Sequence, residues 1–507
     1  MQGNITRRQV LRQMTTAGAA LVSFPLLKHA QAQEATRQGE GNKKPNIIYI
    51  LADDLGWGDL GCYGHLTCKT PRLDRMAEEG ILFEQFYVNA PVCSPSRASL
   101  LTGAFPSRMG IHYWMADEEH NRRYGMPECL DPQIATLPRL LQKAGYRTAH
   151  FGKWHVGAKT EVPVLAYGYD EADLIWQGKG PNPGIAPSDP RGTEMLVDRT
   201  IRFMKECREK QQPFFVNLWP RDVHAALRPT PQMLARYKHL QSEGLQTAMQ
   251  VYYACVTEMD VQIGRLLDFI DSQPGLAENT LIIFSSDNGP EDIYISHAGY
   301  SAVGLPGPFR GRKRSLYEGG VRLPFIARWK GTIPAGVVDR KSVISAVDVL
   351  PTCCKLAGVV PADCDGEDVG SALLGKSAHV RRKPLFWEWR FDGEGQCLNR
   401  SPMLAIRDGD WKLLFNPDGS RSELYNIPRQ PMELHSCAEK YKDIVERLTA
   451  TALAWQKTLP VGPVTSRPGS DAYPGYPEGS GLKSPDSLKQ LLKSVKVQVT
   501  ENDLHND

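Results

Sequence analysis

The sequence has little net charge, no long apolar run and no Cys-x-x-Cys pair. Its 507 residues include 60 Lys and Arg against 57 Asp and Glu, a formal net charge of +3. This balance excludes a nucleic-acid coat spread over the surface, so any recognition of an anion has to be local. A membrane span needs about twenty consecutive apolar residues, and no segment approaches that length. The sequence therefore predicts neither a nucleic-acid partner nor stable membrane insertion.

The first 33 residues have the composition of an export signal. Arg7 and Arg8 precede a modest apolar run over residues 17–27, and small residues typical of a cleavage site follow it. This order resembles a twin-arginine signal peptide. A basic amphipathic helix of the mature protein is the alternative, although no acidic residue occurs before Glu34. We expect residues 1–33 to engage the twin-arginine export machinery, which predicts a periplasmic location, with secretion as the alternative.

The eleven cysteines include no Cys-x-x-Cys pair. This excludes a zinc ribbon and a thioredoxin-type redox site. A protein exported by the twin-arginine route folds in a reducing compartment, so most of the cysteines are expected to be buried thiols. The sequence leaves open whether Cys62 and Cys68 form a disulfide.

Short apolar runs alternate with helical patterns along most of the chain, which is typical of an α/β fold with a sheet sandwiched by helices. The predicted strands cover residues 46–51, 148–151, 213–219 and 280–285, and the predicted helices cover residues 137–144, 193–210 and 245–269. In such sheets ligands bind beyond the carboxyl ends of the strands. The residues that follow each strand are therefore the first candidates for a site.

The pattern changes near Lys383. The region before it, residues 45–382, is predicted to form one large α/β domain. Strands predicted at residues 384–389, 405–407 and 411–415, followed by a helix at 441–459, indicate a smaller C-terminal α+β domain over residues 383–459. Residues 460–507 are first rich in Pro, Gly and Ser and then basic, which predicts a tail that runs over the surface.

Two polar pairs follow predicted strands and are expected at one edge of the sheet. Asp53 and Asp54 follow the first strand, and Asp287 and Asn288 follow the fourth. Carboxylate and amide oxygens suit a hard cation, Ca²⁺ or Mg²⁺, whereas zinc normally recruits His or Cys. Either pair alone is equally typical of a turn or a helix cap.

Residues 93–103 read Cys-Ser-Pro-Ser-Arg-Ala-Ser-Leu-Leu-Thr-Gly. Pro95 favours the first turn of a helix, which puts Cys93 at a helix N-terminus, where anions are favoured. A buried structural cysteine before a helix is the alternative. The pattern Cys-x-Pro-Ser-Arg followed by Leu-Thr-Gly resembles the signature of the type I sulfatases, in which the cysteine is oxidised to formylglycine (3-oxoalanine).

Four further segments resemble motifs of the same family: residues 151–155, 217–224, 311–322 and 423–433. The stretch 297–313 is similar to the arylsulfatase A and N-acetylgalactosamine-6-sulfatase branch. The resemblance runs from about residue 45 to about residue 459, and it implies an alkaline-phosphatase-like mixed sheet sandwiched by helices. The metal ligands that it implies are Asp53, Asp54, Cys93 in its modified form, Asp287 and Asn288. The catalytic residues that it implies are Cys93, Arg97, Lys153, His155, His224 and Lys313.

The resemblance also implies a mechanism. Lys153, His224 and Lys313 would grip the sulfate oxygens, and Arg97 would hold the hydrated formylglycine. One hydroxyl of that hydrate would attack sulfur with Asp287 as the base. His224 or Lys313 would then protonate the leaving alcohol. Removal of the other hydroxyl's proton by a histidine, His155, would expel sulfate.

The implied function is that of a sulfuric ester hydrolase acting on a sulfated carbohydrate, such as 6-sulfated N-acetylgalactosamine or galactose. The implied cofactors are Ca²⁺, with Mg²⁺ as the alternative, and formylglycine made from Cys93 by a formylglycine-generating enzyme. A formylglycine-dependent phosphodiesterase or phosphonate hydrolase and an inactive sugar-binding homologue remain open. Aromatic faces stack on sugars, and the candidate substrate contacts are His112, Trp114, Trp176, His297 and Arg310, each with a packing or surface role as the alternative.

Overall fold

The computed structural model describes residues 44–157, 162–175, 184–187, 189–242, 247–293, 295, 298–391, 399–464 and 469. The chain divides into two units, residues 1–44 and 45–507, and the description below concerns the second. The predicted export signal and most of the predicted tail lie outside the described residues.

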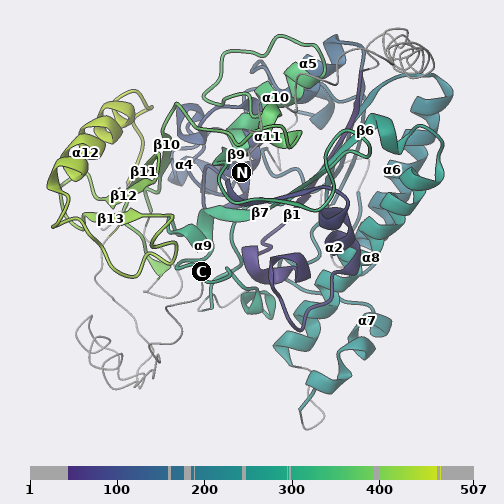
Figure 1. Ribbon diagram of the computed structural model, residues 1–507, viewed down its shortest axis with the longest axis horizontal. Helices are drawn as coiled ribbons and strands as arrows, with labels where there is room; N and C mark the ends of the chain where they lie inside the picture. Colours follow the sequence, from purple (N-terminus) through teal and green to yellow (C-terminus); the bar gives the residue numbers. More distant parts are fainter. Residues whose placement is uncertain are drawn as a thin grey trace, which may run out of the picture. The chain divides into compact units, whose positions relative to one another are not determined.

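A mixed nine-stranded sheet forms the centre of this unit, with the order β4-β3-β5-β1-β6-β7-β2-β8 and β9 beside β2 (Figure 1). Its strands are β1 Asn46–Ala52, β2 Ile81–Tyr87, β3 Arg147–Gly152, β4 Glu171–Leu174, β5 Phe214–Trp219, β6 Thr280–Ser286, β7 Arg322–Arg328, β8 Val337–Asp339 and β9 Ile344–Ser345. The strands from β4 to β6 are parallel, and β7 is antiparallel to both of its neighbours. The mixed sheet of the expected fold class is confirmed.

Strand β1 lies at the middle of the sheet because both of its faces are apolar. Ile47 and Tyr49 face one hydrophobic core, and Ile48 and Ile50 face the other. All four are fully buried. A continuous apolar run of this kind is typical of a parallel strand covered on both sides, and each buried isoleucine contributes roughly 1.5–3 kcal/mol. The two cores hold β1 and its carboxyl end in place.

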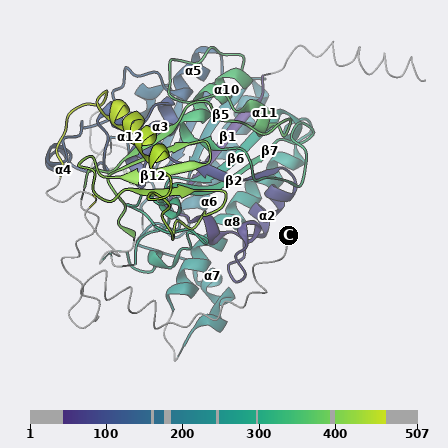
Figure 2. The ribbon, with the colours of Figure 1, turned by 60° about the vertical axis from the view of Figure 1, so that its left-hand side comes forward.

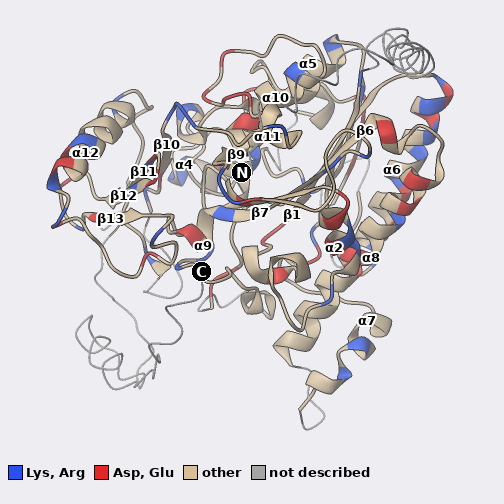
Figure 3. Ribbon diagram, in the orientation of Figure 1, with Lys and Arg blue, Asp and Glu red and all other residues tan. Residues whose placement is uncertain are grey.

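Helices cover both faces of the sheet (Figures 1 and 2). One core includes residues of α2 Pro71–Glu78, α6 Gly192–Glu209, α7 Pro231–Arg236 and α8 Ala248–Ser272. The other includes residues of α3 Cys93–Thr102, α5 Leu137–Lys143, α9 Glu318–Val321, α10 Val349–Leu356, α11 Gly370–Leu373 and α12 Lys442–Gln456. The remaining α-helix of the described residues is α4 Glu118–Arg123. Acidic and basic residues are interspersed along α6 and α12 (Figure 3), as expected for helices with one solvated face.

A second, antiparallel sheet follows in the sequence, with the order β10-β11-β12-β13. Its strands are β10 Leu385–Glu388, β11 Leu404–Asp408, β12 Trp411–Phe415 and β13 Glu423–Asn426. Trp387 is fully buried and donates its indole N–H to Val88 O over 2.7 Å. The expected small sheet with a helix is confirmed, and its core is continuous with that of the large sheet.

The predicted strands and helices agree with the structure to within a few residues at their ends, whereas the strands β2, β4, β7, β8, β9 and β13 are not predicted from the sequence. Cys62 and Cys68 are both free thiols, so the disulfide left open by the sequence does not form. In the described part of the chain, no helix combines the length and the apolarity that a membrane crossing needs.

Candidate functional site

The two polar pairs meet because β1 and β6 are neighbouring parallel strands. Ala52 pairs with Ser286 in the register of these strands, so the residues that follow each of them lie side by side. The backbone N–H of Asp287 donates to Ala52 O over 3.1 Å. The backbone N–H of Asp54 donates to Oδ1 of Asp287, also over 3.1 Å. The structure thus brings Asp53, Asp54, Asp287 and Asn288 together, all at most 1% exposed.

Cys93 is the first residue of α3 and lies against this acidic group. One ligand atom from each of Asp53, Cys93 and Asp287 falls within 4.8 Å of the others. All ten residues of α3 are buried, so the helix is held on every side. Burial raises the pKa of the Cys93 thiol, and Lys153 and Lys313 oppose that shift. The predicted position of Cys93 at a helix N-terminus is confirmed.

Three of the predicted cations bind the carboxylates directly, and Arg97 and Lys153 are the first two. Arg97 donates two hydrogen bonds to Oδ2 of Asp287, one from Nε over 2.9 Å and one from a terminal guanidinium nitrogen over 2.6 Å. The same terminal nitrogen lies 3.2 Å from Oδ1 of Asp53. Lys153 Nζ donates to both oxygens of Asp53, over 2.9 and 2.8 Å. Burial alone would raise the pKa of Asp53, but Lys153, His224 and Arg97 outweigh it and hold that pKa well below its usual value.

Lys313 reaches the same site from the segment before α9. Its Nζ lies 2.7 Å from Oδ2 of Asp54 and 3.3 Å from Oε2 of Glu291. Burial would lower the pKa of Lys313, but Asp54 and Glu291 more than compensate and raise it. Glu291 also pairs with Arg314. Neither Glu291 nor Arg314 is predicted from the sequence, although each lies within three residues of a predicted site residue.

His155 has one buried ring nitrogen without a hydrogen-bond partner within the described residues. Its Nε2 lies 2.9 Å from Met115 O, and because a carbonyl only accepts, this nitrogen carries the proton of the neutral ring. Nδ1 is buried and has no hydrogen-bond partner within the described residues. Burial lowers the pKa of His155, and Lys153 and Arg97 lower it further. The residue is thus a neutral imidazole with a free lone pair, as a general base requires.

His224 follows β5 and faces the carboxylates from another direction. Its Nε2 lies 3.8 Å from Oδ2 of Asp54, and its Nδ1 lies 2.7 Å from Ala225 O and 2.9 Å from a guanidinium nitrogen of Arg221. These contacts fix the ring. Burial lowers the pKa of His224. Arg221, which the sequence analysis did not single out, therefore orients a predicted catalytic residue.

The donor set fits a hard divalent cation. Asn288 donates its amide N–H to Oδ1 of Asp54 over 2.7 Å, and its own Oδ1 is buried with no hydrogen-bond partner within the described part of the chain. Such an oxygen is costly unless something binds it. Burial also raises the pKa of Asp54 and of Asp287, so both carboxylates gain from a further positive charge. Oxygen donors of this kind suit Ca²⁺ or Mg²⁺.

The five candidate substrate contacts have different surroundings. His112 is buried, with Nδ1 3.7 Å from Glu388 Oε2. Trp114 is half-buried and packs on His120, with 4.0 Å between ring centroids. Arg310 stacks on Tyr317 and lies 3.4 Å from Glu423. Trp176 and His297 lie outside the described residues. The structure does not bring the three described candidates into the acidic cluster, and their contact with substrate stays a prediction.

Comparisons with known proteins agree on one family. A family model described as Sulfatase matches residues 45–359, and a second, described as N-sulphoglucosamine sulphohydrolase, C-terminal, matches residues 310–458. The chain is 31% identical to N-acetylgalactosamine-6-sulfatase of Canis lupus familiaris over 82% of its own length and 87% of that protein. It is 33% identical to arylsulfatase A of Homo sapiens, over 75% and 76% of the two chains. The crystal structure of PsFucS1 sulfatase from Pseudoalteromonas sp. superimposes with a TM-score of 0.67 at 25% identity and covers 87% of this chain and 96% of that one.

Proposed function

Because the chain belongs to the sulfatase family, we propose that it hydrolyses the sulfate ester of a sulfated carbohydrate by means of formylglycine made from Cys93 and a bound Ca²⁺. Its fold is the alkaline-phosphatase-like fold of that family. The observation that carries the proposal is the meeting of Asp53, Cys93 and Asp287 within 4.8 Å, surrounded by cationic side chains.

The charges of the site suit an anionic substrate. Three carboxylates, Asp53, Asp54 and Asp287, are paired with three cations, Arg97, Lys153 and Lys313. The divalent ion would leave the group with an excess positive charge, which favours the binding of a sulfate ester and stabilises the charge that develops on the leaving oxygen. Lys153, Lys313 and His224 face the position of the sulfate oxygens in this proposal.

The metal would be held by the side-chain oxygens of Asp53, Asp54, Asp287 and Asn288, and it would polarise the sulfate and the nucleophile. A formylglycine at position 93 would supply, as its hydrate, one nucleophilic hydroxyl and a second hydroxyl from which sulfate can be expelled. The proposed metal is Ca²⁺, with Mg²⁺ as the alternative, because both prefer oxygen ligands.

The remaining side chains bind charge and move protons. Arg97 already contacts the carboxylates of Asp287 and Asp53, and it orients the residue at position 93. Nδ1 of His155, which has no hydrogen-bond partner within the described residues, would accept the proton of the second hydroxyl at position 93 as sulfate is released. His224 or Lys313 gives a proton to the leaving alcohol.

The proposed substrate is a saccharide that carries 6-sulfated N-acetylgalactosamine or galactose. The relative from Canis lupus familiaris is called N-acetylgalactosamine-6-sulfatase, which supports this choice. We assign the catalytic domain to residues 45–382 and the C-terminal subdomain to residues 383–459. Residues 1–33 are proposed to direct export by the twin-arginine machinery to the periplasm, and a formylglycine-generating enzyme is proposed to modify Cys93.

The test is release of inorganic sulfate. The mature protein, coexpressed with a formylglycine-generating enzyme, is incubated with an oligosaccharide that ends in 6-sulfated N-acetylgalactosamine, after mass spectrometry has confirmed formylglycine at position 93. Sulfate release supports the proposal. Release of phosphate from a phosphodiester or phosphonate ester, without sulfate release from any sulfated sugar, would favour a phosphodiesterase or phosphonate hydrolase. Failure of both, with formylglycine present, would favour an inactive sugar-binding protein.

A further inference from the structure

The hydroxyl of Ser94, the residue after Cys93, binds a segment outside its own helix. Ser94 is fully buried in the first turn of α3, and its Oγ accepts the backbone N–H of Met115 over 2.9 Å. Met115 lies 21 residues further along the chain and is also fully buried. This hydrogen bond therefore ties the start of α3 to the segment 114–116.

The carbonyl group of Met115 in turn binds the ring of His155. Met115 O lies 2.9 Å from Nε2 of His155, and because a carbonyl oxygen only accepts, Nε2 is the donor. A neutral imidazole carries a single ring proton, so Nδ1 keeps its lone pair. The N–H of Met115 thus binds Ser94 while its C=O binds His155. Two hydrogen bonds through one peptide residue connect the hydroxyl beside position 93 with the proposed base.

The residues on either side of Met115 have partners of their own, both from α4. Trp114 O lies 3.0 Å from Nε2 of His120, and the backbone N–H of Ala116 donates to Oδ1 of Asn121 over 3.0 Å. These bonds hold the ends of the segment, but they do not satisfy the N–H of Met115. A buried N–H without an acceptor is costly. Loss of the hydroxyl on α3 would therefore favour a shift of the Met115 peptide toward another acceptor.

The backbone of His155 also depends on its surroundings. Its φ is +61°, in the left-handed region that residues with a side chain rarely adopt. Residues in this region keep their conformation only where the surrounding structure imposes it. Within the described residues Nδ1 has no hydrogen-bond partner, so the bond from Nε2 to Met115 O is the polar contact that directs the ring. A shift of Met115 would reach His155 directly.

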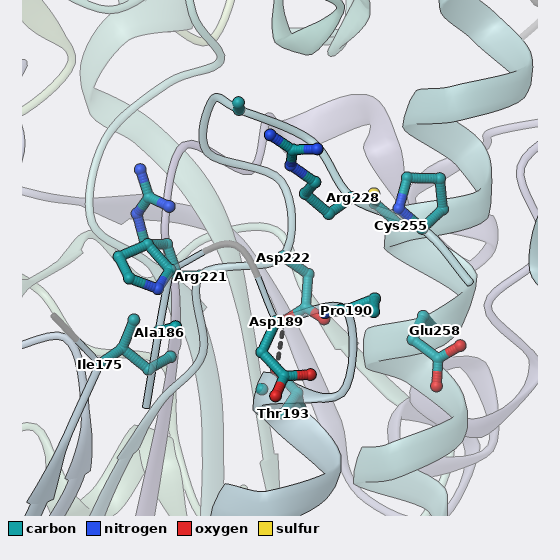
Figure 4. A pocket seen from close by; sticks show the side chains of 14 residues that line it. Ile175, Ala186, Asp189, Pro190, Thr193, Arg221, Asp222, Arg228, Cys255 and Glu258 are labelled. Atoms are coloured by element: carbon teal, nitrogen blue, oxygen red, sulfur yellow. Dashed lines mark hydrogen bonds between the residues drawn. The ribbon is translucent and has the colours of Figure 1, made fainter. Parts of the chain in front are cut away.

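The other histidine of the site is held in a different way. Figure 4 shows Arg221 in the loop that also carries Asp222, and a guanidinium nitrogen of Arg221 lies 2.9 Å from Nδ1 of His224. A charged side chain thus orients His224, whereas a backbone carbonyl orients His155. A shift of the Met115 peptide is therefore expected to act on His155 and to leave His224 in place.

We propose that Ser94 is a positioning residue, which acts through the backbone of Met115 to keep the proton of the neutral His155 ring on Nε2 and its Nδ1 available as a base. The use of that base rests on the proposed function, whereas the position of the proton can be measured without turnover. Without the hydroxyl, the N–H of Met115 loses its acceptor. Its carbonyl then no longer faces Nε2, and the ring can carry the proton on either nitrogen.

The first test measures the tautomer of His155 by NMR of protein with isotope-labelled histidine rings, because the nitrogen chemical shifts show which nitrogen carries the proton. The protein keeps an unmodified Cys93 and is measured at about pH 8, where an ordinary imidazole is neutral. His155→Gln assigns the signals. We expect the proton on Nε2 in the wild type, both tautomers in Ser94→Ala, and the wild-type tautomer in Ser94→Thr, which keeps a hydroxyl. A proton on Nδ1 in the wild type, or an unchanged tautomer in Ser94→Ala, would overturn the proposal.

The second test measures the kinetics of the modified enzyme on one sulfate ester, with the formylglycine content of each variant determined by mass spectrometry. Ser94→Ala should lower kcat about tenfold and change KM less, since a misplaced base loses part of the roughly 10²–10⁴-fold that general base catalysis contributes. Ser94→Thr should restore most of kcat. Ser99→Ala is the matched control, because Ser99 is equally buried in α3 and its hydroxyl donates to Ser96 O of the same helix. Wild-type kcat in Ser94→Ala, or an equal loss in Ser99→Ala, would contradict the positioning role.

The two tests separate failure of this inference from failure of the proposed function. A wild type that releases no sulfate from any sulfated sugar contradicts the proposed function, and the NMR measurement still decides whether Ser94 controls the proton of His155. Sulfate release by the wild type together with an unchanged tautomer in Ser94→Ala rejects this inference alone.

Discussion

Glu291 and Lys313 form a buried ion pair, with 3.3 Å between Oε2 and Nζ, and their side chains are 3% and 5% exposed. The other side of the same ammonium group binds Asp54 over 2.7 Å. Lys313 therefore contacts one carboxylate of the proposed metal site, that of Asp54, and one carboxylate outside it, that of Glu291. Glu291 thus positions a residue that is proposed to bind sulfate.

Glu291→Gln keeps the shape of this side chain and removes its charge. We expect KM for a sulfate ester to rise about tenfold while kcat changes less, because a hydrogen bond to a charged group contributes about 1.5–3 kcal/mol and Lys313 loses one of its two anionic partners. Steady-state kinetics on a single sulfated monosaccharide provide the measurement. Glu278→Gln, at an exposed glutamate, is the control. A kcat loss with unchanged KM would contradict a positioning role.

Cys93 substitutions separate the two proposed hydroxyl functions. Cys93→Ala should abolish sulfate release, because no nucleophile remains at the start of α3. Cys93→Ser keeps one hydroxyl and should become sulfated without turning over, since a serine has no second hydroxyl from which sulfate can be expelled. Intact-mass spectrometry after incubation with substrate detects the adduct. Turnover like that of the wild type in Cys93→Ala would disprove the scheme.

Removal of the metal should lower both activity and stability. A ligand that binds only the folded state at a hundred times its Kd adds about 2.7 kcal/mol to the free energy of unfolding. We expect EGTA to lower Tm and sulfate release, and added Ca²⁺ to restore both. The control is Asn288→Leu, which deletes the buried, unpartnered oxygen and should lose most of the Ca²⁺-dependent rise in Tm. An EGTA-insensitive wild type with no bound metal by elemental analysis would exclude the site.

A second buried charge cluster predicts a pH dependence of stability. Lys412 binds Glu318 over 2.8 Å and Glu433 over 3.0 Å, and all three side chains are fully buried. Burial raises the pKa of Glu433 to about 7, against the attraction of Lys412. The pKa of Glu318 lies at about 2, because Lys412, Arg322 and Arg407 outweigh its burial.

The direction of this pH dependence follows from the pKa of Glu433, which is higher in the folded state than in the unfolded state. Folded Glu433 binds its proton more tightly than unfolded Glu433, so the associated stability is fully present below the usual pKa of about 4.3 and is lost as the pH rises through about 7. We expect the free energy of unfolding to fall by about 2 kcal/mol between pH 5 and pH 8, and Tm to fall with it. Glu433→Gln should flatten this slope in thermal unfolding at both pH values, and an unchanged slope would show that Glu433 is not its source.

The sequence predicts the part of the site that directly follows apolar strands, namely the pairs Asp53–Asp54 and Asp287–Asn288. Residues 47–51 are apolar throughout, and so are residues 281–284. Both fold as strands, β1 and β6, and both end in the expected polar pairs. The helix at Cys93 is equally predictable, because Pro95 stands in its first turn.

Other elements depend on partners that are distant in the sequence. Strand β7 contains Pro324, and proline normally argues against a central strand. It is nevertheless central, between β6 and β2, and Pro324 O accepts the hydroxyl of Ser285 over 2.8 Å. His112 likewise has Glu388 as its neighbour, from a strand of the second sheet. No local pattern predicts such pairings, because tertiary packing decides them.

The burial of Cys93 sets an order of events in the life of the chain. Its side chain is 2% exposed, and α3 is enclosed along its whole length, so a maturation enzyme cannot reach the thiol once the sheet has closed. The proposed oxidation of Cys93 to formylglycine would therefore have to precede completion of folding. A chain exported in folded form by the twin-arginine route would therefore receive its catalytic group in the cytoplasm, before it crosses the membrane, and a chain that folds unmodified could not be repaired afterwards.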